Sequence, residues 1–150
     1  MNYFLKLSLI SLILLYSDLS LAALTKQRYC EIIRNSEHTE SWIKWGIDIK
    51  RKMDEYHATA PSKENMNKYI NSVFEQIGKF VDKEYENAMK ADEKINSEHR
   101  NNNFPQFSID QVYMREWIVY EILRSKEQKS ITQHKLSVYY YCMDTIKPLD

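Results

Sequence analysis

The two cysteines of this 150-residue chain, Cys30 and Cys142, have the greatest capacity for chemistry. A catalytic thiol needs a base that favours the thiolate, and His134 lies about two helical turns before Cys142. Nothing else near either cysteine completes a catalytic triad. Each cysteine lies on the apolar side of its predicted helix, and two cysteines allow only one intramolecular bond. We therefore favour a structural disulfide between them over a catalytic thiol or an intermolecular bridge.

The histidines and their acidic neighbours give little support for a metal site. The four histidines are His38, His57, His99 and His134. Helical zinc sites place two ligands at close spacing, as in HExxH, and no two histidines here are close. Asp54 and His57, three residues apart, are the one pair with metal-like spacing. Because such pairs are typical of a solvated helix face, we expect no metal and no cofactor.

The carboxylates also argue against catalysis. In the segment DKEYENAMKADEK, residues 82–94, acids alternate with lysines, and Glu86 precedes Lys90 by four residues. This pattern is typical of a solvent-exposed helix, whereas acid–base catalysis needs two carboxylates in one cleft with separated pKa values. With two glycines in the chain, glycine-rich phosphate loops and nucleophile elbows are excluded. We expect no catalytic residue and no enzymatic activity.

The elements that position these residues are predicted to be helices, since two glycines and three prolines are too few for an all-β fold. Thr25 is a suitable N-cap for the first helix. Along it, Tyr29, Ile32, Ile33, Ser36, Trp42 and Ile43 recur at helical spacing. We expect Gly46 to end this helix and Asp48 to cap a second one. The alternative, one helix through Gly46, costs only about 1 kcal/mol.

The rest of the chain continues the helical pattern. The linker HATAPS precedes Ser62, and a long apolar stripe over residues 66–95 predicts a helix that packs within its own domain rather than in a coiled coil. A loop with Pro105 follows, and then a helix capped by Ser108 or Asp110. Ser130 opens a last helix with a capping-box pattern, and Pro148 stops it. Residues 23–150 are therefore predicted to form one all-α domain, a bundle of four or five helices.

Residues 1–22 resemble a cleavable signal peptide. Lys6 precedes an apolar run over residues 7–15, and Ser20-Leu21-Ala22 fits signal peptidase, with cleavage after Ala22 or Ala23. The apolar run is far shorter than the roughly 20 residues of a membrane span. We expect a periplasmic or secreted protein with no stable membrane anchor after signal cleavage. An oxidising compartment also favours the disulfide.

Charge and aromatic content indicate which kinds of partner to expect. Equal numbers of basic and acidic residues, 21 of each, argue against nucleic acid. Eleven tyrosines and three tryptophans are many for this length, and successive residues of one helix cannot all point inward. The last helix is apolar on more than one side, so we expect it to be a central helix surrounded by its neighbours. A partner-binding surface is the alternative; its candidates are Trp42, Trp45, Trp117, Tyr140 and Tyr141.

Short motifs spread over most of the chain resemble a family of small uncharacterised exported bacterial proteins. These motifs are Cys30, the turn Lys44-Trp45-Gly46-Ile47 with Asp48 as cap, the pair Val112-Tyr113, and Tyr139-x-x-Cys142. The long charged middle helix departs from the pattern and is interpreted as an insertion. The resemblance implies a disulfide-linked helical domain and brings no catalytic residue.

Export, small size, a stapled scaffold and surplus aromatic residues together favour a small binding protein whose partner is another protein. Its most concrete form is a periplasmic inhibitor or immunity protein against a toxin. The alternative is a general envelope factor, either chaperone-like or involved in surface assembly. The sequence carries no signal for the oligomeric state.

Overall fold

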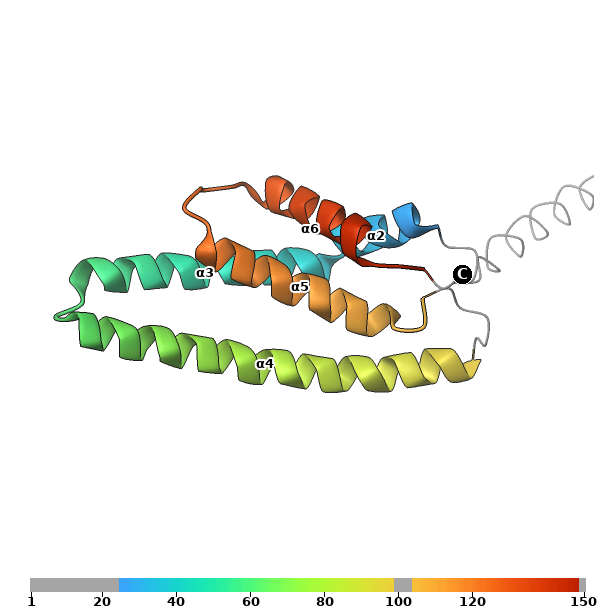
Figure 1. The fold of residues 1–150 in the computed structure, drawn as a ribbon, viewed down its shortest axis with the longest axis horizontal. Coiled ribbons are helices and arrows are strands. Elements are labelled where there is room, and N and C mark those ends of the chain that lie inside the picture. The colour runs from blue at the N-terminus through green and yellow to red at the C-terminus, as the bar shows by residue number, and fades with distance from the viewer. Residues whose placement is uncertain (1–24, 99–103, 149–150) are drawn as a thin grey trace, which may run out of the picture.

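The computed structural model describes residues 25–98 and 104–148, and these residues form five α-helices (Figure 1). The helices are α2 (Lys26–Asn35), α3 (Glu37–Thr59), α4 (Lys63–Glu98), α5 (Phe107–Arg124) and α6 (Ile131–Thr145). A disulfide joins Cys30 in α2 to Cys142 in α6, with 5.7 Å between their Cα atoms. The predicted all-α bundle and its disulfide are confirmed. The predicted signal peptide lies outside the described residues.

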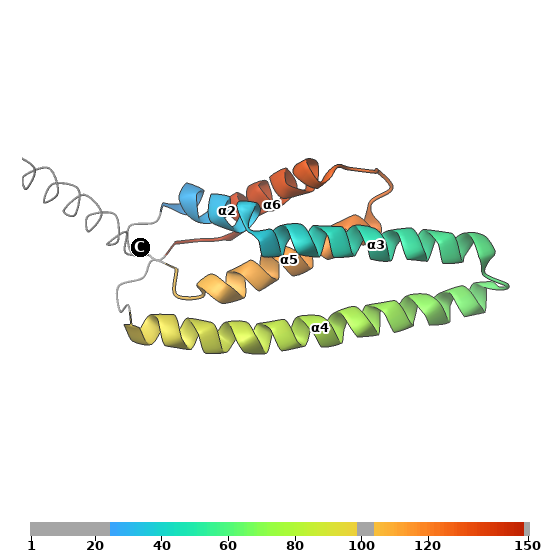
Figure 2. The same cartoon turned by 180° about the vertical axis from the view of Figure 1, so that it is seen from behind.

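The helices form three layers (Figures 1 and 2). Helices α3 and α5 lie in the middle, α2 and α6 cover one side, and α4 covers the other. The C-terminal part of α3 and the N-terminal part of α4 extend together past the end of α5. No described helix is both long and apolar enough to cross a membrane.

Two apolar clusters hold the layers together, and α5 contributes to both. One joins α2, α3, α5 and α6 and includes Tyr29, Ile33, Ile43, Met114, Ile118 and Val138. The other joins α3, α4 and α5 and includes Trp42, Ile77, Val81, Ala88, Val112 and Val119. Opposite faces of α5 are therefore buried, so α5 is the central helix, whereas the last helix, α6, which the sequence predicted to be central, lies in an outer layer.

The break between the first two helices lies at Ser36, ten residues before the predicted break at Gly46. Ser36 has an extended backbone, and its hydroxyl accepts a hydrogen bond from the Thr39 amide at 3.1 Å. The Thr39 hydroxyl donates to the carbonyl of Ile33 at 2.7 Å, and the Ser36 hydroxyl donates to the same carbonyl at 3.1 Å. One short segment therefore ends α2 and caps α3.

Gly46 does not stop a helix, so the predicted break there is wrong. It is buried in the middle of α3, and a Cβ at this position would lie 3.2 Å from Ile122 Cδ1 and 3.5 Å from Val119 Cα. Its missing side chain allows α5 to approach α3 closely. Asp48 is not a cap either, because its carboxylate pairs with Arg51 and Lys52 on the surface of α3.

The start of α5 is capped from another helix. Ser108 and Asp110 were the predicted caps, but the N-cap position is Gln106, which makes no side-chain cap hydrogen bond. Instead, the buried carboxylate of Asp92 in α4 accepts hydrogen bonds from the amides of Ser108, at 2.7 Å, and Ile109, at 3.0 Å. The cap prediction is therefore wrong, and a residue of the charged middle helix fixes α5 to α4.

The predicted ends of the other helices are close to the observed ones. Thr25 caps α2, and Ser62 precedes α4 with its hydroxyl accepting from the Asn65 amide. Helix α4 extends three residues beyond Ile95, to Glu98. The capping box at α6 is confirmed, because Ser130 and Gln133 each bind the other's backbone amide.

Candidate functional site

The last helix presents two different faces. His134, Val138 and Cys142 are buried at four-residue intervals and face the core. On the opposite side, Leu136 is 40% exposed and Tyr140 is 62% exposed. These two residues are one turn apart, so they form a continuous apolar strip on the outer face of α6.

The predicted surface aromatics Trp42 and Trp45 belong to the interior between α3 and α4. Trp42 is buried in the second apolar cluster, and Trp45 is half-buried against it. Phe80 of α4 packs on both rings, with centroids 5.2 Å from Trp42 and 4.9 Å from Trp45. These tryptophans hold α4 to α3, and Trp42 offers no surface to a partner.

Trp117 and Tyr141 cover each other between α5 and α6. Their rings stack with centroids 4.0 Å apart, and the hydroxyl groups of Tyr141 and Tyr113 lie 2.9 Å apart. Both residues pack against the first apolar cluster, to which α4 contributes no residue. Of the five proposed surface residues, Tyr140 is the most exposed.

Neighbouring side chains fix the position of Tyr140. Its ring meets the edge of the Tyr139 ring with centroids 5.6 Å apart. The guanidinium of Arg34 in α2 lies 5.1 Å from the centroid of Tyr139. The disulfide joins the same two helices, so Tyr140 projects from a rigid part of the molecule.

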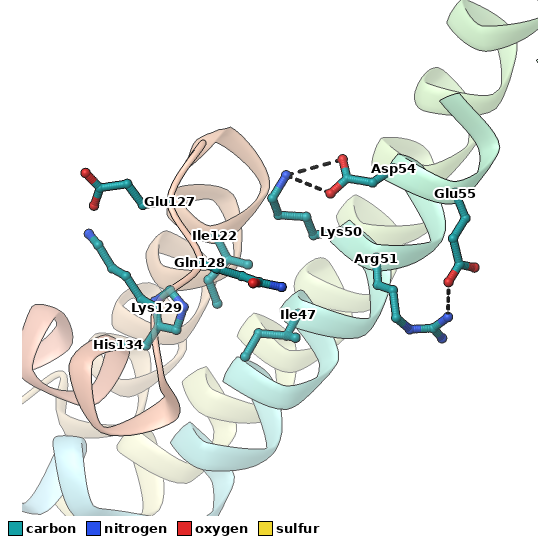
Figure 3. Close-up of a pocket in the computed structure, with 10 residues that line it drawn as sticks. All are labelled: Ile47, Lys50, Arg51, Asp54, Glu55, Ile122, Glu127, Gln128, Lys129 and His134. Carbon is teal, nitrogen blue, oxygen red and sulfur yellow. Dashed lines mark hydrogen bonds and ion pairs between the residues drawn. The ribbon is translucent and has the colours of Figure 1, made fainter. Parts of the chain in front are cut away.

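A pocket of about 280 Å³ lies between α3 and the loop from α5 to α6 (Figure 3). Its lining residues are Ile47, Lys50, Arg51, Asp54, Glu55, Ile122, Glu127, Gln128, Lys129 and His134. Figure 3 shows the Gln128 amide extending from the loop toward α3, with Lys50 above it and Ile47 below. The pocket therefore combines polar groups with an apolar floor.

The charges at this pocket are partly matched. Lys50 Nζ lies 3.3 Å from Oδ1 and 3.1 Å from Oδ2 of Asp54. Arg51 pairs with Glu55 and also with Asp48, and Figure 3 shows its side chain turned toward Glu55 and away from Lys50. Lys50 and Arg51 therefore each have an acidic partner, whereas Lys129 has no ion-pair partner among the described residues.

His134 is 3% exposed, and its Nδ1 atom is buried without a hydrogen-bond partner in the described part of the chain. Burial lowers the pKa of the imidazole, and the positive charge of Lys129 lowers it further, while Glu121 has a smaller opposite effect. His134 is therefore neutral near pH 7. An unpaired buried polar atom of this kind is rare and needs an explanation.

The structure gives His57 and Asp54 no shared role. Asp54 pairs with Lys50, and His57 is exposed near the end of α3. Among the described residues, no three histidine, cysteine or acidic side chains come together in a way that could hold a metal ion.

Arg115 is a buried cationic group, and its role is structural. Its guanidinium donates to Gln111 Oε1 at 2.6 Å and lies near the hydroxyls of Ser36 and Thr39. Burial lowers the pKa of Arg115 to about 10, so it stays charged at neutral pH. Arg115 thus ties α5 to the junction between α2 and α3.

Sequence reasoning missed the pocket, because its residues come from two segments separated by more than sixty positions and carry no shared motif. From the sequence, His134 is a candidate only as a base for Cys142, whose sulfur is in the disulfide. Comparison with known proteins found no matching family model, no similar curated protein and no similar solved structure.

Proposed function

We propose that this chain is an exported protein that binds another protein, most concretely a periplasmic inhibitor or immunity protein against a toxin. The observation that carries the proposal is the outer face of α6, where Tyr140 and Leu136 are exposed on a rigid helix. Tyrosine is enriched at binding hot spots because it buries a large ring with little loss of conformational freedom.

The surroundings of this face support recognition of a protein. Tyr140 is anchored through Tyr139 and Arg34, so little ordering is needed before a partner binds. The internal disulfide suits an oxidising compartment, which is consistent with the predicted signal peptide. The equal numbers of acidic and basic residues give no reason to prefer nucleic acid as the partner.

The test compares matched aspartate substitutions. Wild-type protein, Tyr140→Asp and Met89→Asp are used to capture proteins from an envelope extract of the producing cell. Met89 is 49% exposed on α4, so its substitution controls for the loss of any exposed apolar group. We expect Tyr140→Asp to lose a partner that wild type and Met89→Asp retain. Equal capture by all three proteins would remove the α6 face from the proposal.

The inhibitor form makes a further demand on the captured protein. Expression of the captured protein in the periplasm should arrest growth, and co-expression of this chain should restore growth. A captured protein that is harmless would contradict the inhibitor role. Suppression of aggregation of several unrelated clients, independent of Tyr140, would instead favour the general envelope factor.

A further inference from the structure

We propose that the pocket between α3 and the α5–α6 loop binds a small organic carboxylate, held by Lys50 and Gln128 with His134 beside them (Figure 3). This inference is independent of the proposed protein-binding face, because no pocket residue belongs to the exposed strip on α6. It rests on the size of the pocket, its apolar floor, its available donors and an unpartnered buried atom.

The size and floor of the pocket suit a small ligand with a hydrocarbon part. Its volume of about 280 Å³ lies just below the usual range for drug-sized ligands. Ile47 and Ile122 line it from α3 and α5 and offer apolar contact. A short branched or linear acid would place its hydrocarbon part against these two side chains.

Lys50 and Gln128 supply the donors for the carboxylate. A lysine ammonium has three N–H donors, and Lys50 directs at most two of them to Asp54. The side chain of Lys50 is 27% exposed, so it is partly desolvated and has at least one donor left for a ligand. The Gln128 amide forms no hydrogen bond within the described residues, and Figure 3 shows it extending toward the same space. The two groups therefore have free donors on one side of the pocket.

His134 contributes its Nδ1 atom, which has no hydrogen-bond partner among the described residues. Its Nδ1 is buried with no partner in the described residues, although the residue lines the pocket. A carboxylate oxygen would accept a hydrogen bond from the tautomer that carries its proton on Nδ1. Because Nδ1 is covered in the free chain, the ligand reaches it only when the side chains above it move.

The charges favour a monoanion over a dianion such as phosphate. Arg51 is already paired with Asp48 and Glu55, and Lys50 shares its charge with Asp54. Lys129 also lines the pocket, but the three basic residues there are balanced by the three acidic residues Asp54, Glu55 and Glu127, so burying a second negative charge would be costly. One negative charge and a hydrocarbon part match the groups that are present.

The test uses sodium isovalerate as the ligand and the full exported chain as the protein. The imidazole signals of His134 are followed by NMR while isovalerate replaces sodium chloride at constant ionic strength. We expect saturable shifts at His134, with the exposed His38 and His57 unaffected. Shifts that fail to saturate, or that are equal at all three histidines, would overturn the proposal. Equal binding of the neutral amide, isovaleramide, would overturn carboxylate recognition.

Matched lysine variants assign the binding to the pocket. Lys50→Met removes the proposed cation and should weaken isovalerate binding about tenfold, as for loss of a charge-assisted hydrogen bond. Lys68→Met is the control, since Lys68 of α4 also pairs with an acid four residues away, Glu64, and lies outside the pocket. Its affinity should equal that of wild type. An unchanged affinity in folded Lys50→Met, or an equal loss in both variants, would refute this site.

Discussion

Helices α6 and α4 lie on opposite sides of the central α3–α5 layer, but different interactions hold them there. Helix α6 is bonded to α2 through the disulfide, and its Lys135 forms an ion pair with Glu40 of α3. Helix α4 spans 36 residues, of which Ile77, Val81, Ala88 and Asp92 are buried. Helix α6 therefore has a covalent link in addition to its apolar packing, whereas α4 is held without one.

The difference shows how the bundle secures helices of unequal length. Helices α2 and α6 are 10 and 15 residues long, so each buries little apolar surface alone, and the disulfide compensates for this. Helix α4 is long enough to collect many small contacts along one stripe. Its polar links to α5, from Tyr85 to Glu116 and from Asp92 to two amides, fix its position along that stripe.

The largest expected effect comes from removing the disulfide. In Cys30→Ser/Cys142→Ser, the free energy of unfolding should fall by about 4 kcal/mol, because the bond closes a long loop and restricts the unfolded chain. Urea denaturation at neutral pH measures the loss. The fold itself should persist, since Tyr29, Ile33 and Val138 stay buried in the same apolar cluster.

Mass spectrometry without reductant gives the companion result for wild type. Cys30 and Cys142 should appear in one cross-linked peptide pair with no free thiol. Exported protein with two free thiols would contradict the assigned bond. A double-serine variant as stable as wild type would show that packing alone positions α6, and the contrast with α4 would disappear.

The next largest effect is expected for Asp92→Ala. This change leaves the Ser108 and Ile109 amides without their cap and should cost about 2 kcal/mol, since the lost hydrogen bonds are charge-assisted and buried. Urea denaturation measures the total. Hydrogen exchange of the two amides should accelerate more than exchange in α6.

Glu93→Ala is the matched control for Asp92→Ala. Glu93 is the exposed neighbour in the same helix, so its loss removes a charge from α4 without touching α5. Its stability should stay close to that of wild type. If both variants lose the same stability, the cap across helices contributes nothing beyond the general charge of α4.

The sequence predicted the features that depend on local pattern. Helical spacing of apolar residues located α4, and the Ser130 capping box placed the start of α6. The disulfide also followed, because two cysteines on apolar helix faces allow one pairing. Ser36 was missed although a local signal existed: a serine followed by Glu37 and Glu40 is typical of a helix start.

The features that the sequence did not predict depend on contacts between distant segments. Asp92 stands in an alternating charged segment that favours a solvated face, and only the approach of α5 makes it a buried cap. Gly46 resembles a helix stop, but its role is to admit α5, which begins about sixty residues later. The pocket at His134 likewise exists only once α3 and the α5–α6 loop meet.

A smaller effect on the free energy of unfolding should appear at acidic pH. It again distinguishes α6, which is linked to α3 by an ion pair, from α4. Lys135 and Lys44 lower the pKa of Glu40 from 4.5 to about 2. Since the folded-state pKa is the lower one, this stabilisation is present above pH 4.5 and is lost as the pH falls toward 2. Glu40→Gln should therefore flatten part of the acid dependence of stability, measured by urea denaturation at several pH values.

Glu75→Gln on α4 provides the contrast to Glu40→Gln. Lys79 also lowers the pKa of Glu75, but both residues belong to α4 and their pair links no second helix. Its removal should change the acid dependence less than Glu40→Gln does. A larger change in Glu75→Gln would show that the link from α3 to α6 is not the source of the acid sensitivity.

The smallest effects on stability are expected from alanine substitutions of the two glycines. They compare how closely α4 and the central α3 are packed at these positions. A Cβ at Gly78 of α4 would have no atom within 4 Å, so Gly78→Ala should raise the free energy of unfolding by about 1 kcal/mol through helix propensity. Gly46→Ala should gain less, because its methyl group must displace Ile122 Cδ1 from 3.2 Å. Thermal unfolding compares the two variants. An equal gain in stability would mean that the Ile122 side chain moves at no energetic cost. The close approach of α5 to α3 would then not depend on the glycine.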